Sequence, residues 1–160
     1  MQILETVKDP EVPVLSVVEL GIVRDVTVAA DGAVEVAITP TYSGCPAMHA
    51  IEADITTALH AAGHPTVRIR TVFNPAWTTE WIGEAAREKL RAYGIAAPGH
   101  LRRGEDDLIP LLRGRTAEAV ACPYCGAKET DLKSEFGTTA CKSIRFCNDC
   151  RQPFEQFKAI

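Results

Sequence analysis

Cys122-Pro123-Tyr124-Cys125 and Cys147-Asn148-Asp149-Cys150 decide the C-terminal fold of this chain. In each stretch, two sulfur atoms on a tight turn can bind the same ion. The two stretches are separated by 21 residues. Together they complete a four-thiolate site, the structural geometry that Zn²⁺ prefers. A redox dithiol or a pair of disulfides is the alternative, but a redox Cys-x-x-Cys normally occurs once, at the start of a helix. The spacing therefore predicts a structural zinc on Cys122, Cys125, Cys147 and Cys150.

The segment that carries these cysteines is small. Segments below about 40 residues seldom bury enough apolar surface to fold without a metal or a disulfide. The stretches Thr130–Phe136 and Phe154–Phe157 have strand-like composition and flank the cysteine turns. We therefore expect residues 118–160 to form a zinc ribbon.

Length and charge restrict the class of protein. The chain has 160 residues and a net charge of −4, and it contains no uninterrupted apolar run long enough to span a membrane. Neither the ribbon segment nor the rest is strongly basic, which weighs against a nucleic-acid partner. The first residues lack the pattern of a signal peptide, so we expect a cytoplasmic protein without a membrane partner. Thiols stay reduced in that compartment, which favours metal ligation over disulfides.

The N-terminal part predicts a small α+β domain with the element order αββαβα. A short helix over residues 2–8 comes first, and Asp31-Gly32 joins strands at Ile22–Val28 and Val34–Thr39 as a hairpin. A helix then opens at Cys45-Pro46 and ends at Gly63. A third strand at residues 67–73 and a last helix over residues 78–93 follow. We expect this domain to span residues 1–94 and a linker rich in glycine, proline and charge to span residues 95–117.

Cys45 is the isolated residue of most chemical interest. It follows a glycine-containing loop and stands at the predicted start of a helix, where backbone N–H groups stabilise a thiolate and lower the pKa of the thiol. It is either a reactive thiol or metal ligand, or a small buried side chain that acts as a hydrophobe. His49 lies one helical turn later and is either a further ligand or an ordinary surface residue.

Two more features have open interpretations. Asp9 and Glu11 flank a proline and are either metal ligands or a solvated turn with a cap. Cys141 falls outside both cysteine pairs and is a spare thiol, a structural residue near the zinc or a redox-sensitive site. The chain carries no phosphate-binding loop, dinucleotide fingerprint, nucleophile elbow or di-iron ligand motif, which weighs against an autonomous enzyme.

Three stretches resemble the small metal–sulfur cluster assembly domain found in bacterial iron–sulfur assembly factors. They are Asp9-Pro10-Glu11-Val12-Pro13-Val14-Leu15-Ser16, Leu20-Gly21-Ile22-Val23-Arg24-Asp25-Val26 and Thr39-Pro40-Thr41-Tyr42-Ser43-Gly44-Cys45-Pro46. With the stretches around Trp77–Ile82 and Lys89–Ile95 and with the ribbon, the whole chain resembles the family of small accessory subunits encoded with the multicomponent phenylacetyl-CoA 1,2-epoxidase of phenylacetate catabolism.

This resemblance implies a function. It implies an accessory protein that is not itself an enzyme and that helps to mature iron–sulfur or iron centres of the epoxidase system. Cys45 would be the functional thiol at a transient iron or iron–sulfur site, with Asp9 and Glu11 beside it. The clients would be the oxygenase and its iron–sulfur reductase. The alternative is a structural subunit of the oxygenase complex, and the sequence leaves open whether the protein forms a homodimer.

Overall fold

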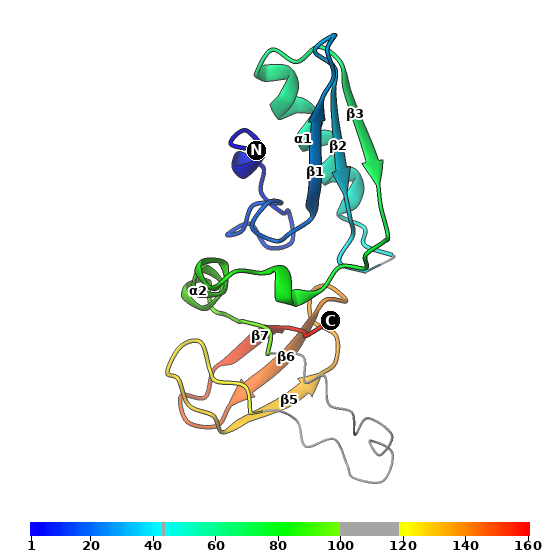
Figure 1. Ribbon diagram of the computed structural model, residues 1–160. Helices are drawn as coiled ribbons and strands as arrows, with labels where there is room; N and C mark the ends of the chain where they lie inside the picture. Colours follow the sequence, from blue (N-terminus) through cyan, green and yellow to red (C-terminus); the bar gives the residue numbers. More distant parts are fainter. Residues whose placement is uncertain (43, 100–118) are drawn as a thin grey trace.

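The computed structural model describes residues 1–42, 44–99 and 119–160 of the chain. Figure 1 shows two sheets, one in the N-terminal part and one in the ribbon, with helix α2 lying between them. Within the described ranges, none of the helices combines the length and the apolar character that crossing a membrane requires. The helical elements are η1 (Leu4–Thr6), α1 (Met48–Ala61), η2 (Thr79–Trp81) and α2 (Glu84–Tyr93), and the strands are β1 (Val23–Val28), β2 (Val34–Ile38), β3 (Val67–Thr71), β4 (Ile95–Ala96), β5 (Thr130–Ser134), β6 (Lys142–Cys147) and β7 (Pro153–Phe157).

The first sheet has the order β1-β2-β3 and confirms the predicted hairpin and third strand. The β1–β2 turn closes through Asp31, whose Oδ1 accepts the N–H of Ala33 at 3.0 Å, and Gly32 takes the positive φ of 83° that the turn requires. Strand β3 returns parallel to β2 after the crossover through α1. The helix buries Ile51, Ile55 and Leu59, which recur at helical spacing.

Helix α1 begins at Met48, two residues later than the sequence predicts. The Cys45 N–H donates to the Tyr42 carbonyl at 3.1 Å, and the Cys45 carbonyl accepts from the Met48 N–H at 3.5 Å. These two tight turns come before the bond from the Ile51 N–H to the Ala47 carbonyl at 3.0 Å, which opens the helix. Cys45 therefore lies in a turn ahead of the helix rather than on its first residue.

The N-terminal segment also differs in part from the prediction. The expected helix over residues 2–8 is only the single turn η1, because Val7 is already extended at φ −79° and ψ 118°. After it, Ser16 and Glu19 form a reciprocal capping box. The Glu19 N–H donates to Ser16 Oγ at 3.1 Å, and the Ser16 N–H donates to Glu19 Oε2 at 2.9 Å. This turn fixes the path of the chain into β1.

Residues 78–93 do not form the single helix that the sequence predicts. The chain breaks at Ile82 and Gly83, which are extended between η2 and α2. The buried Arg87 side chain stabilises the break. Its guanidinium donates to the carbonyls of Ile82 at 2.9 Å, Thr79 at 2.9 Å and Pro98 at 2.6 Å, so one charged side chain ties together the η2 turn, the break and the chain after α2.

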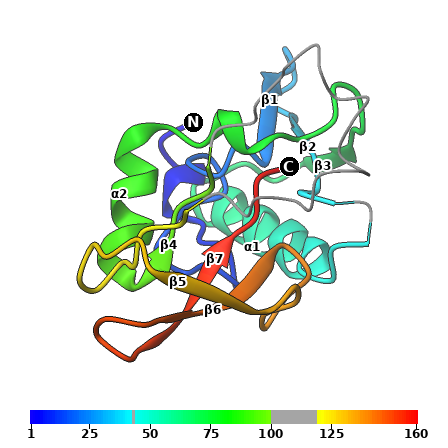
Figure 2. The ribbon, with the colours of Figure 1, turned by 90° about the horizontal axis from the view of Figure 1, so that it is seen from below.

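The ribbon sheet has the order β4-β7-β6-β5. Strand β4 comes directly after α2 yet pairs in parallel with β7, the last strand along the chain (Figure 2). Residues 95–96 are therefore a strand and not the start of a linker, and residues 100–117 of the predicted linker lie outside the described residues. The architecture confirms the predicted α+β fold with a C-terminal zinc ribbon.

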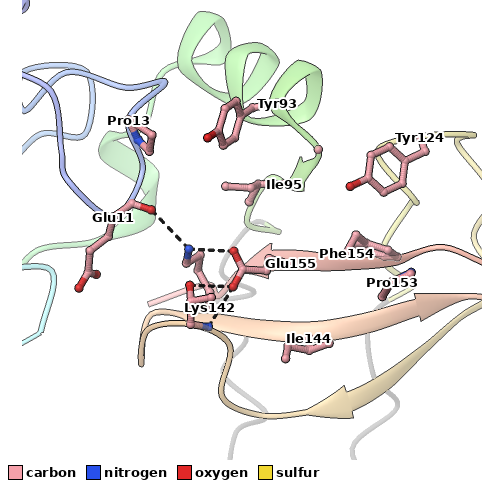
Figure 3. Close-up of a pocket in the computed structure, with 12 residues that line it drawn as sticks. Glu11, Pro13, Tyr93, Ile95, Tyr124, Lys142, Ile144, Pro153, Phe154 and Glu155 are labelled. Atoms are coloured by element: carbon pink, nitrogen blue, oxygen red, sulfur yellow. Dashed lines mark hydrogen bonds and ion pairs between the residues drawn. The ribbon is translucent and has the colours of Figure 1, made fainter.

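The two sheets share one apolar core. Phe157 of β7 is buried in the same cluster as the core residues of the first sheet, and its ring lies 6.0 Å from that of Trp77. The indole N–H of Trp77 donates to the Leu20 carbonyl at 2.8 Å. On the other side of the contact, the buried Lys142 ammonium donates to Glu155 at 2.8 Å and to the Glu11 carbonyl at 3.4 Å (Figure 3). The ribbon is thus anchored to the N-terminal part by apolar packing and by the hydrogen bond from Lys142, whose ammonium is held in place by its ion pair with Glu155 inside the ribbon.

Truncation of Phe157 tests this shared core. We expect Phe157→Ala to lower the free energy of unfolding by about 3–5 kcal/mol, because it leaves a cavity between the two sheets. The matched control is Phe136→Ala in the ribbon, where the ring is 65% exposed and its loss should cost under about 1 kcal/mol. Urea denaturation followed by tryptophan fluorescence measures both values. Equal stability of the two variants would contradict the shared core.

Candidate functional site

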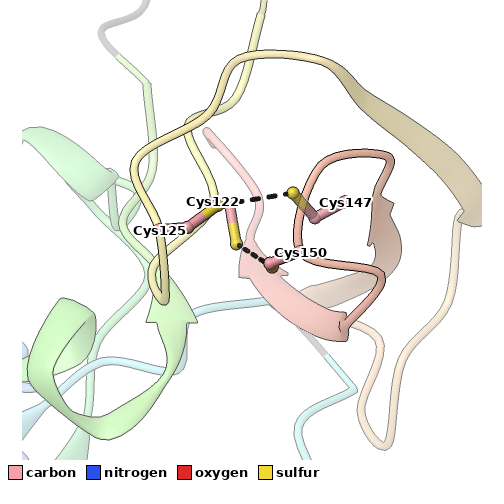
Figure 4. Close-up of side chains that lie close together, drawn as sticks. All are labelled: Cys122, Cys125, Cys147 and Cys150. Carbon is pink, nitrogen blue, oxygen red and sulfur yellow. Dashed lines mark hydrogen bonds between the residues drawn. The ribbon is translucent and has the colours of Figure 1, made fainter.

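The four ribbon cysteines converge on one point between two turns (Figure 4). Their sulfur atoms all lie within 4.8 Å of one another, with 3.7 Å between Cys122 and Cys150 and 3.6 Å between Cys125 and Cys147. Four sulfur atoms that each lie ~2.3 Å from a tetrahedral zinc ion would be about 3.8 Å apart. The observed spacing therefore fits a tetrahedral metal site.

The backbone of both turns suits the same purpose. After the first pair, Gly126 has a φ of 78°, and its N–H donates to the Cys122 carbonyl at 2.9 Å. After the second pair, Arg151 has a φ of 62°, and its N–H donates to the Cys147 carbonyl at 3.1 Å. Backbone N–H groups of the second turn, that of Cys150 first, lower the pKa of Cys147 to about 7. The donor set therefore matches a metal that binds thiolates, such as Zn²⁺.

Metal analysis tests this site. We expect one zinc per chain with Zn–S distances near ~2.3 Å, and we expect Cys125→Ser to lose the metal and unfold the ribbon, since metal binding supplies much of the folding free energy of such modules. The matched control is Asp149→Asn, which changes an exposed residue in the second turn but removes no sulfur. An X-ray absorption spectrum with only nitrogen and oxygen neighbours would contradict the assignment.

A second group of candidate residues lies where the N-terminal part meets the ribbon. Asp9, Glu11, Cys45 and Cys141 line one small cavity of about 10 Å³, together with apolar side chains that include Phe157. Asp9, Glu11 and Cys45 come from two loops of the N-terminal part, and Cys141 comes from the turn that leads into β6. The fold thus brings a ribbon cysteine to the residues that the sequence singles out in the N-terminal part.

The two carboxylates have different roles. Asp9 is buried, and its Oδ1 accepts the N–H groups of Glu11 and Val12, both at 2.8 Å, so it caps the turn that carries Glu11. Burial raises the pKa of Asp9 in spite of these two bonds. Glu11 turns its backbone carbonyl toward Lys142, while its carboxylate points away from that ammonium (Figure 3). The Glu11 carboxylate is therefore the more available ligand of the two.

Cys141 has the surroundings of a positioned side chain. It is buried, and its sulfur lies 3.0 Å from the Thr139 hydroxyl. Burial raises the pKa of the Glu11 carboxyl, and the Thr139 hydroxyl is among the groups that lower it. Sequence reasoning left the role of Cys141 open, because nothing in the spacing of residues 11, 45 and 141 shows that they meet. His49, by contrast, is exposed on α1 and is not among the residues that line the cavity.

The Cys45 thiol differs from the expectation in its acidity. Half-burial raises the pKa of Cys45, the backbone N–H of Ala47 lowers it, and the nearby Glu11, Asp9 and Cys141 raise it further. The sequence predicts a lowered pKa, but the thiol lies before the helix among carboxylates, and desolvation and charge repulsion outweigh the backbone contribution. Cys45 is therefore a protonated thiol at neutral pH until a cation or another partner stabilises its thiolate.

Alkylation kinetics test this environment. Because a raised pKa leaves less thiolate at neutral pH, we expect iodoacetamide to label Cys45 with a pH midpoint above that of an ordinary free cysteine, about 8.5. Mass spectrometry of the labelled peptide gives the rate at each pH, and the same peptide in urea is the control. Restricted access slows labelling at every pH, whereas a shifted midpoint reports the pKa. A midpoint below that of the unfolded control would contradict the raised pKa.

The fold and the cysteine site define an iron–sulfur assembly domain joined to a zinc ribbon. Residues 1–69 match the family model for an iron-sulfur cluster assembly protein, and residues 110–158 match that for the PaaD zinc beta ribbon domain. An Escherichia coli K12 protein, provisionally named as the D subunit of 1,2-phenylacetyl-CoA epoxidase, is 43% identical over 99% of this chain and 90% of its own length. The chain belongs to this family of phenylacetyl-CoA epoxidase D subunits.

Two further relatives each match about half of the chain. A protein of Porphyromonas gingivalis named Fe-S protein maturation auxiliary factor is 37% identical over 56% of this chain and 86% of its own length. The crystal structure of a domain of unknown function, DUF59, from Bacillus anthracis superposes with a TM-score of 0.52 and 31% identity, over 56% of this chain and 85% of that one.

Proposed function

We propose that this protein is an accessory maturation factor for the iron or iron–sulfur centres of a phenylacetyl-CoA epoxidase system. The observation that carries the proposal is the position of Cys45. It is a half-buried thiol in a turn, next to the Glu11 carboxylate, in a domain of the iron-sulfur cluster assembly family. The names of the relatives support both halves of the proposal, the epoxidase system and Fe-S protein maturation.

The chemistry of the Cys45 cavity suits transfer of a metal better than storage. A thiolate is a soft ligand that iron and iron–sulfur species accept, and one thiol with one available carboxylate leaves coordination positions for a client's own ligands. The ribbon cysteines, in contrast, form a complete four-sulfur set. We propose that they hold a structural zinc and that the N-terminal site carries the cargo. The oxygenase and the iron–sulfur reductase of the epoxidase system are the proposed clients, and the protein itself catalyses no step of the epoxidation.

A structural subunit of the oxygenase is the second candidate, and it is favoured by the word subunit in the name of the Escherichia coli relative. Purification of the active oxygenase separates the two. A structural subunit co-purifies in fixed stoichiometry, and its removal from finished enzyme abolishes activity. A maturation factor is needed only while the client is being made, so finished enzyme stays active without it.

Replacement of Cys45 tests the proposed function directly. We expect Cys45→Ser to fold and keep its zinc, with a stability change of about 1 kcal/mol or less, because the change nearly preserves volume. It removes the soft ligand, so client oxygenase and reductase made in cells with this variant should contain less iron and be less active, as when the accessory protein is absent. Iron content per client protein and specific activity are the measurements.

The matched control for this experiment is Thr57→Ser, a similarly small change on the exposed side of α1. It should support the client as well as the wild-type protein does. If Cys45→Ser also yields fully loaded and active client, Cys45 is a packing residue and the proposed mechanism fails.

A further inference from the structure

We propose that Cys141 of the ribbon is a second thiolate ligand beside Cys45, and that the two thiolates with the Glu11 carboxylate bind a single ferrous ion as cargo. The inference rests on the proposed function and extends it in two respects: it names the form of the cargo, and it gives the ribbon a direct part in holding it.

The first argument is that the three proposed ligands lie around one cavity. Cys45 and Cys141 are far apart along the chain but line the same cavity, and Glu11 lines it as well. The Thr139 hydroxyl lies 3.0 Å from the Cys141 sulfur, and it lowers the pKa of the Glu11 carboxyl, which burial raises, so it is near both side chains. A thiol that served only as a hydrophobe would not need two potential ligands of iron as neighbours.

The backbone holds Cys141 in this place. Its carbonyl accepts the Lys158 N–H at 2.9 Å. The ammonium of the next residue, Lys142, donates to the Glu155 carboxylate at 2.8 Å and to the Glu11 carbonyl. The Lys142 ammonium is almost completely buried, so water screens its positive charge less than it would at the surface. Two thiolates and one carboxylate around a divalent ion leave a net charge of −1, and this ammonium lies where it can offset that charge.

The size of the cavity decides between an ion and a cluster. Its volume of about 10 Å³ is close to the smallest space that holds a single water molecule. A cluster of several iron and sulfide atoms exceeds that space, whereas one ion bound directly by the lining side chains fits. Asp9 has a structural role in this assignment, because its Oδ1 accepts two backbone N–H groups and so caps the turn that carries Glu11.

The proposed ligands Cys45, Cys141 and Glu11 are more loosely arranged than the ribbon cysteines, as a site that passes on its ion requires. In the described part of the chain, the ribbon cysteines are the group of three or more potential ligands whose ligand atoms all lie within 4.8 Å of one another. Cys45, Cys141 and Glu11 are not such a group among the described residues, so an ion must draw their side chains together. Because closing the site around the ion takes up some of the binding free energy, the ion is held less tightly and is more easily passed on.

The experiment titrates the zinc-loaded full chain with Fe(II) under strictly anaerobic conditions and records the iron X-ray absorption spectrum at one equivalent. We expect one Fe(II) per chain in addition to the zinc, with two sulfur neighbours and the remainder oxygen or nitrogen. Cys141→Ser and Cys45→Ser should each reduce the sulfur count to one and weaken Fe(II) binding by at least about tenfold. Thr57→Ser is the control and should bind as the wild type does.

The outcomes separate this inference from the proposed function. One sulfur neighbour in the wild type, or unchanged Fe(II) affinity in Cys141→Ser while Cys45→Ser loses the ion, overturns the role of Cys141 and leaves that of Cys45 intact. Unchanged Fe(II) affinity in both serine variants overturns the role of Cys141 and that of Cys45. Four sulfur neighbours would place the iron in the ribbon and reject the inference. The sulfur count of the wild-type chain decides the matter even if Cys141→Ser does not fold.

Discussion

The four thiols of the ribbon are the constraint on which the rest of the structure depends. The apolar cluster around them is small, with Ala96, Cys122, Cys147 and Phe154 as its buried members. So few buried residues cannot offset the entropy of ordering three strands, and a metal on the thiolates supplies what the packing lacks. Once β6 and β7 are ordered, they deliver Phe157 to the core of the N-terminal part and Lys142 to the Glu11 carbonyl. The ribbon is therefore also part of the structure that encloses the Cys45 cavity.

The two groups of cysteines differ because their surroundings differ. The ribbon thiols stand on tight turns whose sulfur atoms converge on one point, an arrangement that suits a shared ion, and backbone N–H groups lower the pKa of Cys147 to about 7. Cys45 stands next to two carboxylates in a half-buried turn, where its thiolate is disfavoured without a compensating cation. The difference between the two groups of cysteines thus arises in part from burial and nearby charge.

Local signals predicted much of this fold. The Asp31-Gly32 turn and the doubled cysteine pairs each depend on residues close in sequence, and each is found as predicted. The failures come from tertiary contacts. Arg87 holds a break in the predicted helix by binding loop carbonyls, and β4 exists only because β7 offers it an edge. The meeting of Cys45 with Cys141 likewise depends on how the two sheets pack, which no local pattern records.

The position of β7 bears on how the chain folds as it is synthesised. Strand β7 is the last along the sequence, yet it lies between β4 and β6 and carries Phe157 into the shared core. On the ribosome, β4 and the apolar surface near Trp77 emerge long before their partner, so the nascent chain exposes an unpaired strand edge and an open hydrophobic face. Pairing across such a long sequence separation is slow, because closing the intervening loop precedes any gain from the contact. Until β7 emerges, this edge and this apolar face lack the partner that covers them in the folded protein.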